Sequence, residues 1–305
     1  MSSGGGGTCW NALSVLYPYR IHRNSFARYI FDKKHECILK VLKAQILDEW
    51  EDASCDVMLS PNNSDVEMNN TVWTFWWQGI GKMPKNAQNC ISQMKKYAGK
   101  HPVVVITRNN WGDYIKIDQI VLDKLNDGKI SIIHLSDIVR MKLLSMYGGL
   151  WLDAGIFPVR PIGEEWFENL YYTRKDVPHQ EANISDSKWC GSVTSGHANF
   201  CFFRFMEFAF DRYWKIYNNL VDYFLIDILT RLAFDNITEF RDAVNEIPYN
   251  NPDLYLAERI LNNNSSSDVI TDIKNNNTFL RLQWRKQYAE FNENRPTIYN
   301  RLLCD

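Results

Sequence analysis

The chain has 305 residues, is 45% hydrophobic and 23% charged, and carries a formal net charge of −2 at pH 7. This balance is typical of a globular protein with one large domain, and the lack of a global basic field excludes nucleic acid from the expected partners. There is no transmembrane stretch, no signal peptide and no CxxC pair among the seven cysteines, so we expect a cytoplasmic protein with reduced thiols.

The first 65 residues are expected to form a segment of their own. Residues 1–10 are glycine-rich and are interpreted as a tag or flexible tail, and residues 11–65 are predicted to be helical with a polar linker at their end. Residues 20–43 are basic, which suits a peripheral position on an anionic membrane surface. The alternative is a helix that packs on the body of the protein and exposes a solvated face.

Residues 66–305 are predicted to form the main domain, whose first half alternates strands with helices. Helices are expected at 86–97, 117–125 and 137–147, the last capped by Ser136 and ended by Gly148. Strands are expected at 71–79, at 101–107, at 130–135 and from Leu150 onward. Such alternation predicts an α/β fold with a mainly parallel sheet, which binds ligands beyond the carboxyl ends of its strands.

The second half of the main domain has a less regular pattern. Aromatic-rich segments at 200–210 and 213–234 are predicted to be mostly helical, with their apolar stripe in the core. A late strand is expected at 278–284, and polar loops at 262–268 and 275–278.

Candidate binding residues lie at the end of the first strand. An aromatic ring there can stack on a nucleobase, and backbone groups beside a glycine can read the edge of the base. Tryptophans that fill the core are the alternative. The candidates are Trp76, Trp77, Gln78 and Gly79.

Acidic and basic side chains form two further candidate clusters. Asp137 and Arg140, beside Ser136, are three residues apart and so share a helical face, where an acid can grip sugar hydroxyls while arginine neutralises phosphate. An acid that merely favours the helix dipole is the alternative for Asp137. Asp153 lies within an apolar strand, where a carboxylate is costly unless a cation or donor groups meet it. A metal-bound sugar nucleotide would satisfy the Asp153 carboxylate. Hydrogen bonds from backbone amides are the alternative.

Two stretches of the chain carry a family resemblance. Residues 134–140 (HLSDIVR) and 147–153 (YGGLWLD) resemble the core of bacterial capsular polysaccharide synthesis proteins, which belong with the DXD-type sugar-binding glycosyltransferases of family 32. Residues 75–79 resemble the opening strand of the family and residues 221–225 a later segment. The likeness extends from about residue 70 to residue 285. The chain is also similar to the sugar-transferring domain of large clostridial toxins.

The resemblance implies a GT-A (Rossmann-like) nucleotide-sugar-binding fold and transfer from a UDP-sugar with retention of configuration. It implies that Ser136, Asp137 and Arg140 hold the donor sugar and phosphate, and that Asp153 lies at the sugar diphosphate and binds Mn²⁺ or Mg²⁺. One residue departs from the family pattern. Gly155 stands where a second acid would provide another oxygen ligand, which weakens the expected metal dependence.

Three late residues are weaker candidates. His197 and Asn199 fall where the family has an acceptor-side and donor-sugar loop, although His197 can equally be an ordinary loop histidine. Trp284, followed by two basic residues, can close over the diphosphate or end a solvated strand.

The function expected from the sequence is that of a retaining hexosyltransferase on the inner face of the plasma membrane. It would move galactose or glucose from UDP to a lipid-linked saccharide, on undecaprenyl diphosphate, during synthesis of a capsule or surface polysaccharide. The alternatives are a catalytically impaired nucleotide-sugar-binding scaffold, which the presence of Gly155 suggests, and an effector that glycosylates proteins.

Overall fold

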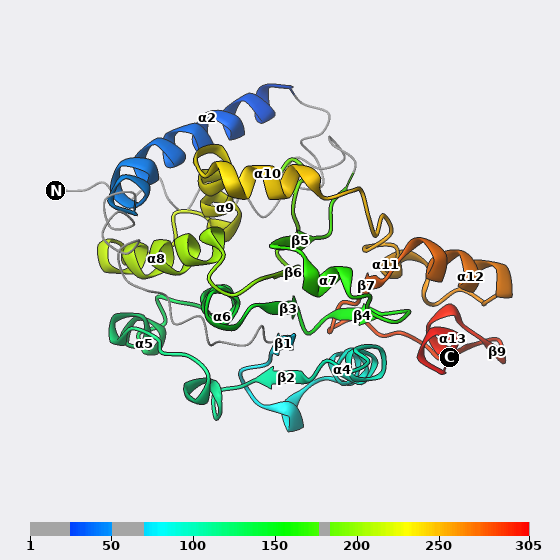
Figure 1. Cartoon of the computed structure of the whole chain (residues 1–305). Coiled ribbons are helices and arrows are strands. Elements are labelled where there is room, and N and C mark those ends of the chain that lie inside the picture. Colours follow the sequence, from blue (N-terminus) through cyan, green and yellow to red (C-terminus); the bar gives the residue numbers. More distant parts are fainter. Residues whose placement is uncertain (1–24, 51–69, 177–183, 305) are drawn as a thin grey trace.

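The computed structural model describes residues 25–50, 70–176 and 184–304, arranged around a central five-stranded sheet in the order β2-β1-β3-β6-β5 (Figure 1). β1, β2 and β3 run parallel, β6 is antiparallel to β3, and β5 is antiparallel to β6. The strands are β1 (Val72–Phe75), β2 (Val103–Ile106), β3 (Gly149–Leu152), β5 (Tyr171–Thr173) and β6 (Val193–Gly196). This mixed, mostly parallel sheet flanked by helices confirms the predicted α/β class and is consistent with a GT-A-like fold.

The register of the parallel strands places their carboxyl ends at one edge of the sheet. Trp73 of β1 pairs with Trp151 of β3, and Phe75 pairs with Ile106 of β2. When the first of these registers is continued by two residues, Phe75 comes level with Asp153, about 5 Å away across the strand spacing. The predicted strand-end candidates on β1 and β3 therefore meet at the same edge.

Two helices between β2 and β3 differ in part from the prediction. α5 (Gln119–Asn126) lies where a helix is expected, but α6 (Ile132–Tyr147) includes most of the predicted strand at 130–135. That strand and the predicted cap at Ser136 are wrong, because the Ser131 side chain accepts a hydrogen bond from the His134 amide and begins the helix five residues earlier. α6 ends at Gly148, as expected.

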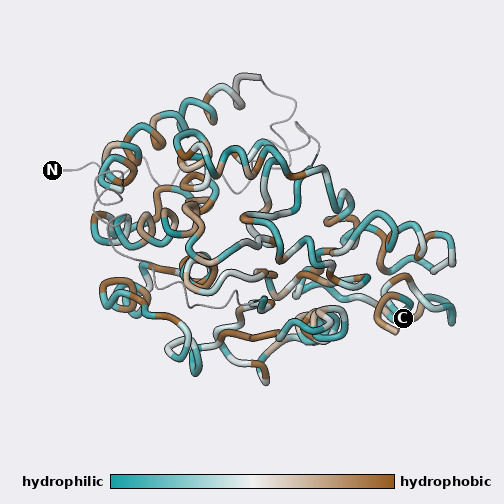
Figure 2. The backbone as a smooth tube through the Cα atoms, viewed as in Figure 1, coloured by the Kyte–Doolittle hydropathy of each residue, from teal (hydrophilic) through white to brown (hydrophobic). Residues whose placement is uncertain are grey.

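Helices cover both faces of the sheet. One face packs on α6 and on α8 (Cys201–Ile216), α9 (Leu225–Asn236) and α10 (Thr238–Glu246). The other face packs on α4 (Lys85–Tyr97) and α7 (Glu165–Glu168). Hydrophobic and hydrophilic residues alternate along α8 and α9 in Figure 2, as expected of helices with one face on a core.

The described part of the N-terminal segment is a helix that belongs to the body of the protein. α2 (Ser25–Leu42) continues through a π-helical turn (Lys43–Leu47) and lies against α9 and α8 (Figure 1). Leu42, Ile46 and Leu47 are buried in the main core. The structure therefore agrees with the alternative prediction, a helix that packs on the body of the protein. Contact of its exposed lysines with a membrane stays a prediction. The predicted tail at 1–10 and most of the predicted linker lie outside the described residues.

The C-terminal part forms a small layer beside the carboxyl edge of the sheet. β4 (Ile156–Pro158) pairs with β7 (Phe279–Arg281), which confirms a late strand. The remaining elements are the 3₁₀ turns Ile80–Lys82 and Trp111–Asp113, α11 (Ala257–Ile260), α12 (Ser267–Asn276), α13 (Ile298–Cys304), β8 (Phe291–Asn292) and β9 (Arg295–Pro296). None of the helices within the described ranges has the length and apolar character needed to span a bilayer.

Candidate active site

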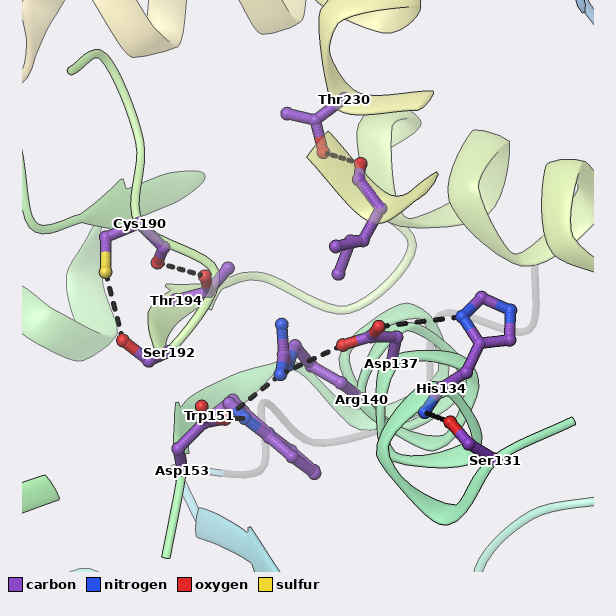
Figure 3. A network of polar contacts seen from close by, with 11 residues as sticks. Ser131, His134, Asp137, Arg140, Trp151, Asp153, Cys190, Ser192, Thr194 and Thr230 are labelled. Carbon is purple, nitrogen blue, oxygen red and sulfur yellow. Dashed lines mark hydrogen bonds and ion pairs between the residues drawn. The ribbon is translucent and has the colours of Figure 1, made fainter. Parts of the chain in front are cut away.

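One arginine joins the two predicted acidic positions (Figure 3). Nη2 of Arg140 lies 3.0 Å from Oδ1 of Asp153 and 3.3 Å from Oδ1 of Asp137. The Arg140 side chain is only 5% exposed, whereas that of Asp153 is 34% exposed. α6 supplies Asp137 and Arg140 from one face, and Asp153 follows directly after β3. The partner that Asp153 requires is therefore a buried guanidinium of the same chain.

Trp151 holds the same carboxylate from within the strand. Its Nε1 donates to Oδ1 of Asp153 at 2.8 Å, and its ring centroid lies 5.0 Å from the Arg140 guanidinium carbon. Residues two apart in a strand point to the same face, which brings Trp151 and Asp153 together toward α6. Both donors use Oδ1, and Oδ2 of Asp153 makes no hydrogen bond with the described residues.

A second set of buried side chains positions Asp137. Trp214 on α8 donates from Nε1 to Nε2 of His134 at 3.0 Å. A neutral imidazole that accepts at Nε2 carries its proton on Nδ1, and Nδ1 lies 3.7 Å from Oδ2 of Asp137. Nδ1 is buried and has no hydrogen-bond partner among the described residues. The imidazole thus presents an N–H toward Asp137 from the side opposite Arg140.

The loop before β6 encloses the cluster. The Asp153 amide donates to the Ser192 carbonyl at 3.0 Å, and a Cβ on Gly191 would lie 2.9 Å from Nη1 of Arg140. A larger residue at position 191 would therefore require the guanidinium to shift. This loop therefore covers Arg140 and keeps its charge out of contact with bulk water.

Groups from α9 and β7 complete the surroundings. Burial raises the pKa of Asp227 to about 6, and the charge of Asp137 adds to this rise. Burial likewise raises the pKa of Tyr223, and the charges of Asp137 and Asp153 add to this rise. Burial opposes the charged form of Arg281, but Tyr255 and Asp153 outweigh it and raise the Arg281 pKa. The site therefore combines several acids with two arginines.

The structure explains why glycine occupies position 155. A Cβ on Gly155 would lie 2.7 Å from the Leu282 carbonyl oxygen, and the Leu282 amide donates to the Gly155 carbonyl at 2.8 Å. The closeness of the chain after β7 leaves no space for a second carboxylate. Among the residues that the structure describes, no three His, Cys, Asp or Glu side chains gather as a metal site. Mg²⁺ is often held by one or two carboxylates with substrate phosphates and water, and the free Oδ2 of Asp153 fits that single role.

Two predicted aromatic candidates meet at the same edge. The rings of Trp76 and Trp284 are 6.1 Å apart in an edge-to-face arrangement, and Trp284 is 45% exposed. Nε1 of Trp76 is buried without a partner among the described residues. Trp77 stacks on the core residue Phe75 and so helps to fill the core, which was the alternative prediction for these tryptophans. The neighbouring Gln78 is exposed, and Gly79 has a positive φ of 91°.

His197 and Asn199 are not brought together with Asp153. β6 is antiparallel to β3, and Gly196 at its end pairs with Gly149 at the start of β3. His197, one residue further, therefore lies about 17 Å along the strand direction from Asp153. Nε2 of His197 contacts the Glu168 carbonyl oxygen at 3.1 Å. We leave both residues out of the site. Ser136 is half-buried on α6, next to Asp137.

Comparison with known proteins identifies the family. The model of the capsular polysaccharide synthesis protein family matches residues 19–302, so the chain belongs to this family. An O-glycosyltransferase braB of Annulohypoxylon truncatum is 29% identical over 133 residues, which are 41% of this chain and 31% of that protein. A glycosyltransferase afumC of Aspergillus fumigatus is 28% identical over 120 residues, 36% of this chain and 30% of that protein. The matches thus span about a third of the length of these curated relatives.

Sequence reasoning did not find all of the site. Trp151 had a detectable signal, since it lies two residues before Asp153 in a strand. Gly191 and Asp227 had none, because each acquires its role only through folding of segments far apart in the sequence.

Proposed function

We propose that this protein is a retaining glycosyltransferase that moves a hexose, galactose or glucose, from a UDP-sugar to an oxygen acceptor. The observation that carries the proposal is the buried guanidinium of Arg140 between Asp137 and Asp153 at the carboxyl edge of the sheet. Membership of the family and relatives named glycosyltransferases support it. The name O-glycosyltransferase favours an acceptor hydroxyl.

Each residue of the cluster has a distinct proposed role. Asp137 accepts hydrogen bonds from hydroxyls of the transferred sugar, held in place by His134 and Arg140. Arg140 fixes both carboxylates, while Arg281, which interacts electrostatically with Asp153, stabilises the negative charge that develops on the leaving diphosphate. Trp76 and Trp284 border the base or the diphosphate. The acceptor hydroxyl attacks from the face that the diphosphate leaves.

The charge balance supports a divalent cation as part of the proposal. Asp137, Asp153 and Asp227 carry three formal negative charges and Arg140 and Arg281 two positive charges, which leaves one net negative charge for an anionic diphosphate to approach. Oδ2 of Asp153 would hold Mn²⁺ or Mg²⁺, and the ion would neutralise the diphosphate when bound.

The acceptor and its location are further parts of the proposal. Family membership supports a lipid-linked saccharide, such as one on undecaprenyl diphosphate in capsule synthesis, reached by a peripheral protein at the inner membrane face. Lys40 and Lys43 are exposed at the end of α2 and in the π-helical turn. Deletion of residues 1–50 would also remove core residues, so charge reversal is the cleaner test.

A vesicle assay separates the two roles of this helix. Replacing Lys40 and Lys43 with Glu is expected to weaken sedimentation with phosphatidylglycerol vesicles and to leave donor hydrolysis unchanged. The control replaces the exposed Lys95 and Lys96 of α4, on the opposite face of the sheet, with Glu. Equal vesicle binding by wild type and both double variants removes membrane docking through α2.

Release of nucleoside diphosphate tests the enzyme itself. Wild type is incubated with UDP-glucose, UDP-galactose, UDP-N-acetylglucosamine or GDP-mannose, with Mn²⁺ or with chelator. Release is expected from a UDP-hexose and to be lost in Asp153→Asn, while Asp127→Asn, an exposed acid paired with Lys129, behaves as wild type. Tight UDP binding without release, even with acceptor present, would instead support the scaffold, and labelled sugar on protein would support the effector.

A further inference from the structure

We propose that Asp227 is a further substrate-binding residue, whose carboxylate accepts hydrogen bonds from hydroxyls of the donor sugar. This role rests on the proposed function and extends it to a residue that no local sequence signal selects. It adds an acid from α9 that faces the α6 cluster from the other side of the site.

Asp227 belongs to the first turn of α9 and is tied to the loop that covers Arg140. Its Oδ1 accepts a hydrogen bond of 3.0 Å from Nε1 of Trp189. Two residues later in the same loop, a Cβ on Gly191 would lie 2.9 Å from Nη1 of Arg140, and the Ser192 carbonyl accepts a hydrogen bond from the Asp153 amide. Residues 189–192 of this loop therefore connect Asp227, at Trp189, to Arg140 and Asp153, at Gly191 and Ser192.

The start of α9 is held firmly, which fixes the position of Asp227. Oδ1 of the buried Asp222 accepts the Phe224 amide at 2.9 Å, immediately before the helix. Lys34 and His35 of α2 both contact Oδ2 of Asp222. Tyr223, which is 51% exposed, lies beside them and interacts electrostatically with Asp137 and Asp153. The same end of α9 thus reaches the site with more than one side chain.

The surroundings of Asp227 leave hydrogen-bonding capacity for a ligand. A carboxylate has about four lone-pair positions, and Trp189 is the one hydrogen-bond donor recorded for Asp227 among the described residues. The charged groups that act on it are Asp137 and Arg140 of α6 and Asp222 before α9, and Asp227 in turn acts on Tyr171 of β5. The residue as a whole is half-buried. Sugar hydroxyls would satisfy it better than an apolar ligand.

The charged groups around the site also suggest which part of the donor Asp227 contacts. Asp137 and Arg140 interact electrostatically with Asp227, Asp153 interacts with Arg281, and Tyr223 interacts with both Asp137 and Asp153. If the diphosphate lies at Asp153 and Arg281, the sugar extends toward Asp137 and Asp227. Two carboxylates that face one sugar can select its hydroxyl configuration, because a missing partner leaves a buried acid unpaired.

Calorimetric titration of UDP and of the active UDP-hexose tests the assignment. Asp227→Asn keeps the size of the side chain, so the affinity for UDP is expected to stay within twofold of wild type. The affinity for the UDP-hexose is expected to fall about tenfold or more, the effect of losing a hydrogen bond to a charged group. Asp235→Asn, at the exposed end of the same helix and paired with Arg231, is the matched control and should change neither.

A second variant and the wild-type control keep the test decisive. Trp189→Phe removes the donor that orients Asp227 and is expected to give a smaller loss, again confined to the UDP-hexose. Equal losses for UDP and UDP-hexose, or none for either, would overturn the sugar contact. Failure of wild type to bind any nucleotide or nucleotide sugar of the panel would overturn the proposed function itself, whereas normal binding by Asp227→Asn would overturn only this inference.

Discussion

A carboxylate at position 155 would restore the second acid of the family pattern, and the structure predicts that the protein cannot accommodate it. The Cβ of Gly155→Asp would lie 2.7 Å from the Leu282 carbonyl oxygen. The backbone on both sides is held, because the Leu282 amide donates to the Gly155 carbonyl at 2.8 Å and β4 pairs with β7. Overpacking of this kind costs about 1–3 kcal/mol. At about 2–4 °C for each kcal/mol, the melting temperature should fall by about 2–12 °C.

Thermal unfolding followed by circular dichroism measures this effect. Gly155→Ala adds the same Cβ without a charge and should show most of the loss. Gly81→Asp is the matched control, since no atom lies within 4 Å of its Cβ position, and it should stay within about 0.5 kcal/mol of wild type. If Gly155→Asp melts like wild type and binds Mn²⁺ more tightly, the steric explanation for the missing acid is refuted.

Three other perturbations have expected outcomes. Arg140→Met leaves Asp137 and Asp153 without their shared cation and should lower the free energy of unfolding, measured in urea, by about 3–5 kcal/mol; a loss below 1 kcal/mol would contradict the buried pairing. Trp214→Phe removes the donor to His134 but keeps a ring, and should cost about 1–3 kcal/mol in the same assay and weaken donor binding; unchanged donor binding would remove His134 from the positioning of Asp137. Burial lowers the pKa of His35 from 6.5 to about 4, with Asp222 opposing, so the unfolded chain binds more protons. Stability from this group is therefore complete above pH 6.5 and is lost as the pH falls toward 4, and the difference between wild type and His35→Gln should shrink over that range.

The sequence predicted β1, β2 and β3 and the position of Asp153 near the end of β3, because strand ends and the turn at Gly148 are local signals, but it did not predict β5 and β6. It also placed Asp137 and Arg140 on one face, since spacing of three residues holds wherever the helix begins. The start of α6 was wrong because a short apolar run fits both a strand and a buried helix, and Ser131 rather than Ser136 provides the cap.

Other features depend on contacts between distant segments. The carbonyl of Leu282 excludes a side chain at Gly155. The sequence shows that position 155 is glycine, but it does not show that Leu282 lies close by and is the reason. His197 follows a strand and was expected near the donor, but the antiparallel direction of β6 carries it to the opposite edge. Strand direction within a mixed sheet is not encoded in the local pattern of one strand.

The central claim is that the Asp137–Arg140–Asp153 cluster binds the donor. Isothermal titration of the active nucleotide sugar with Mn²⁺ into wild type, Asp137→Asn, Asp153→Asn and Asp127→Asn tests it most directly. We predict that the affinity falls at least tenfold in both cluster variants and is unchanged in Asp127→Asn. Equal affinity in all four proteins would contradict the assignment of this cluster as the donor site.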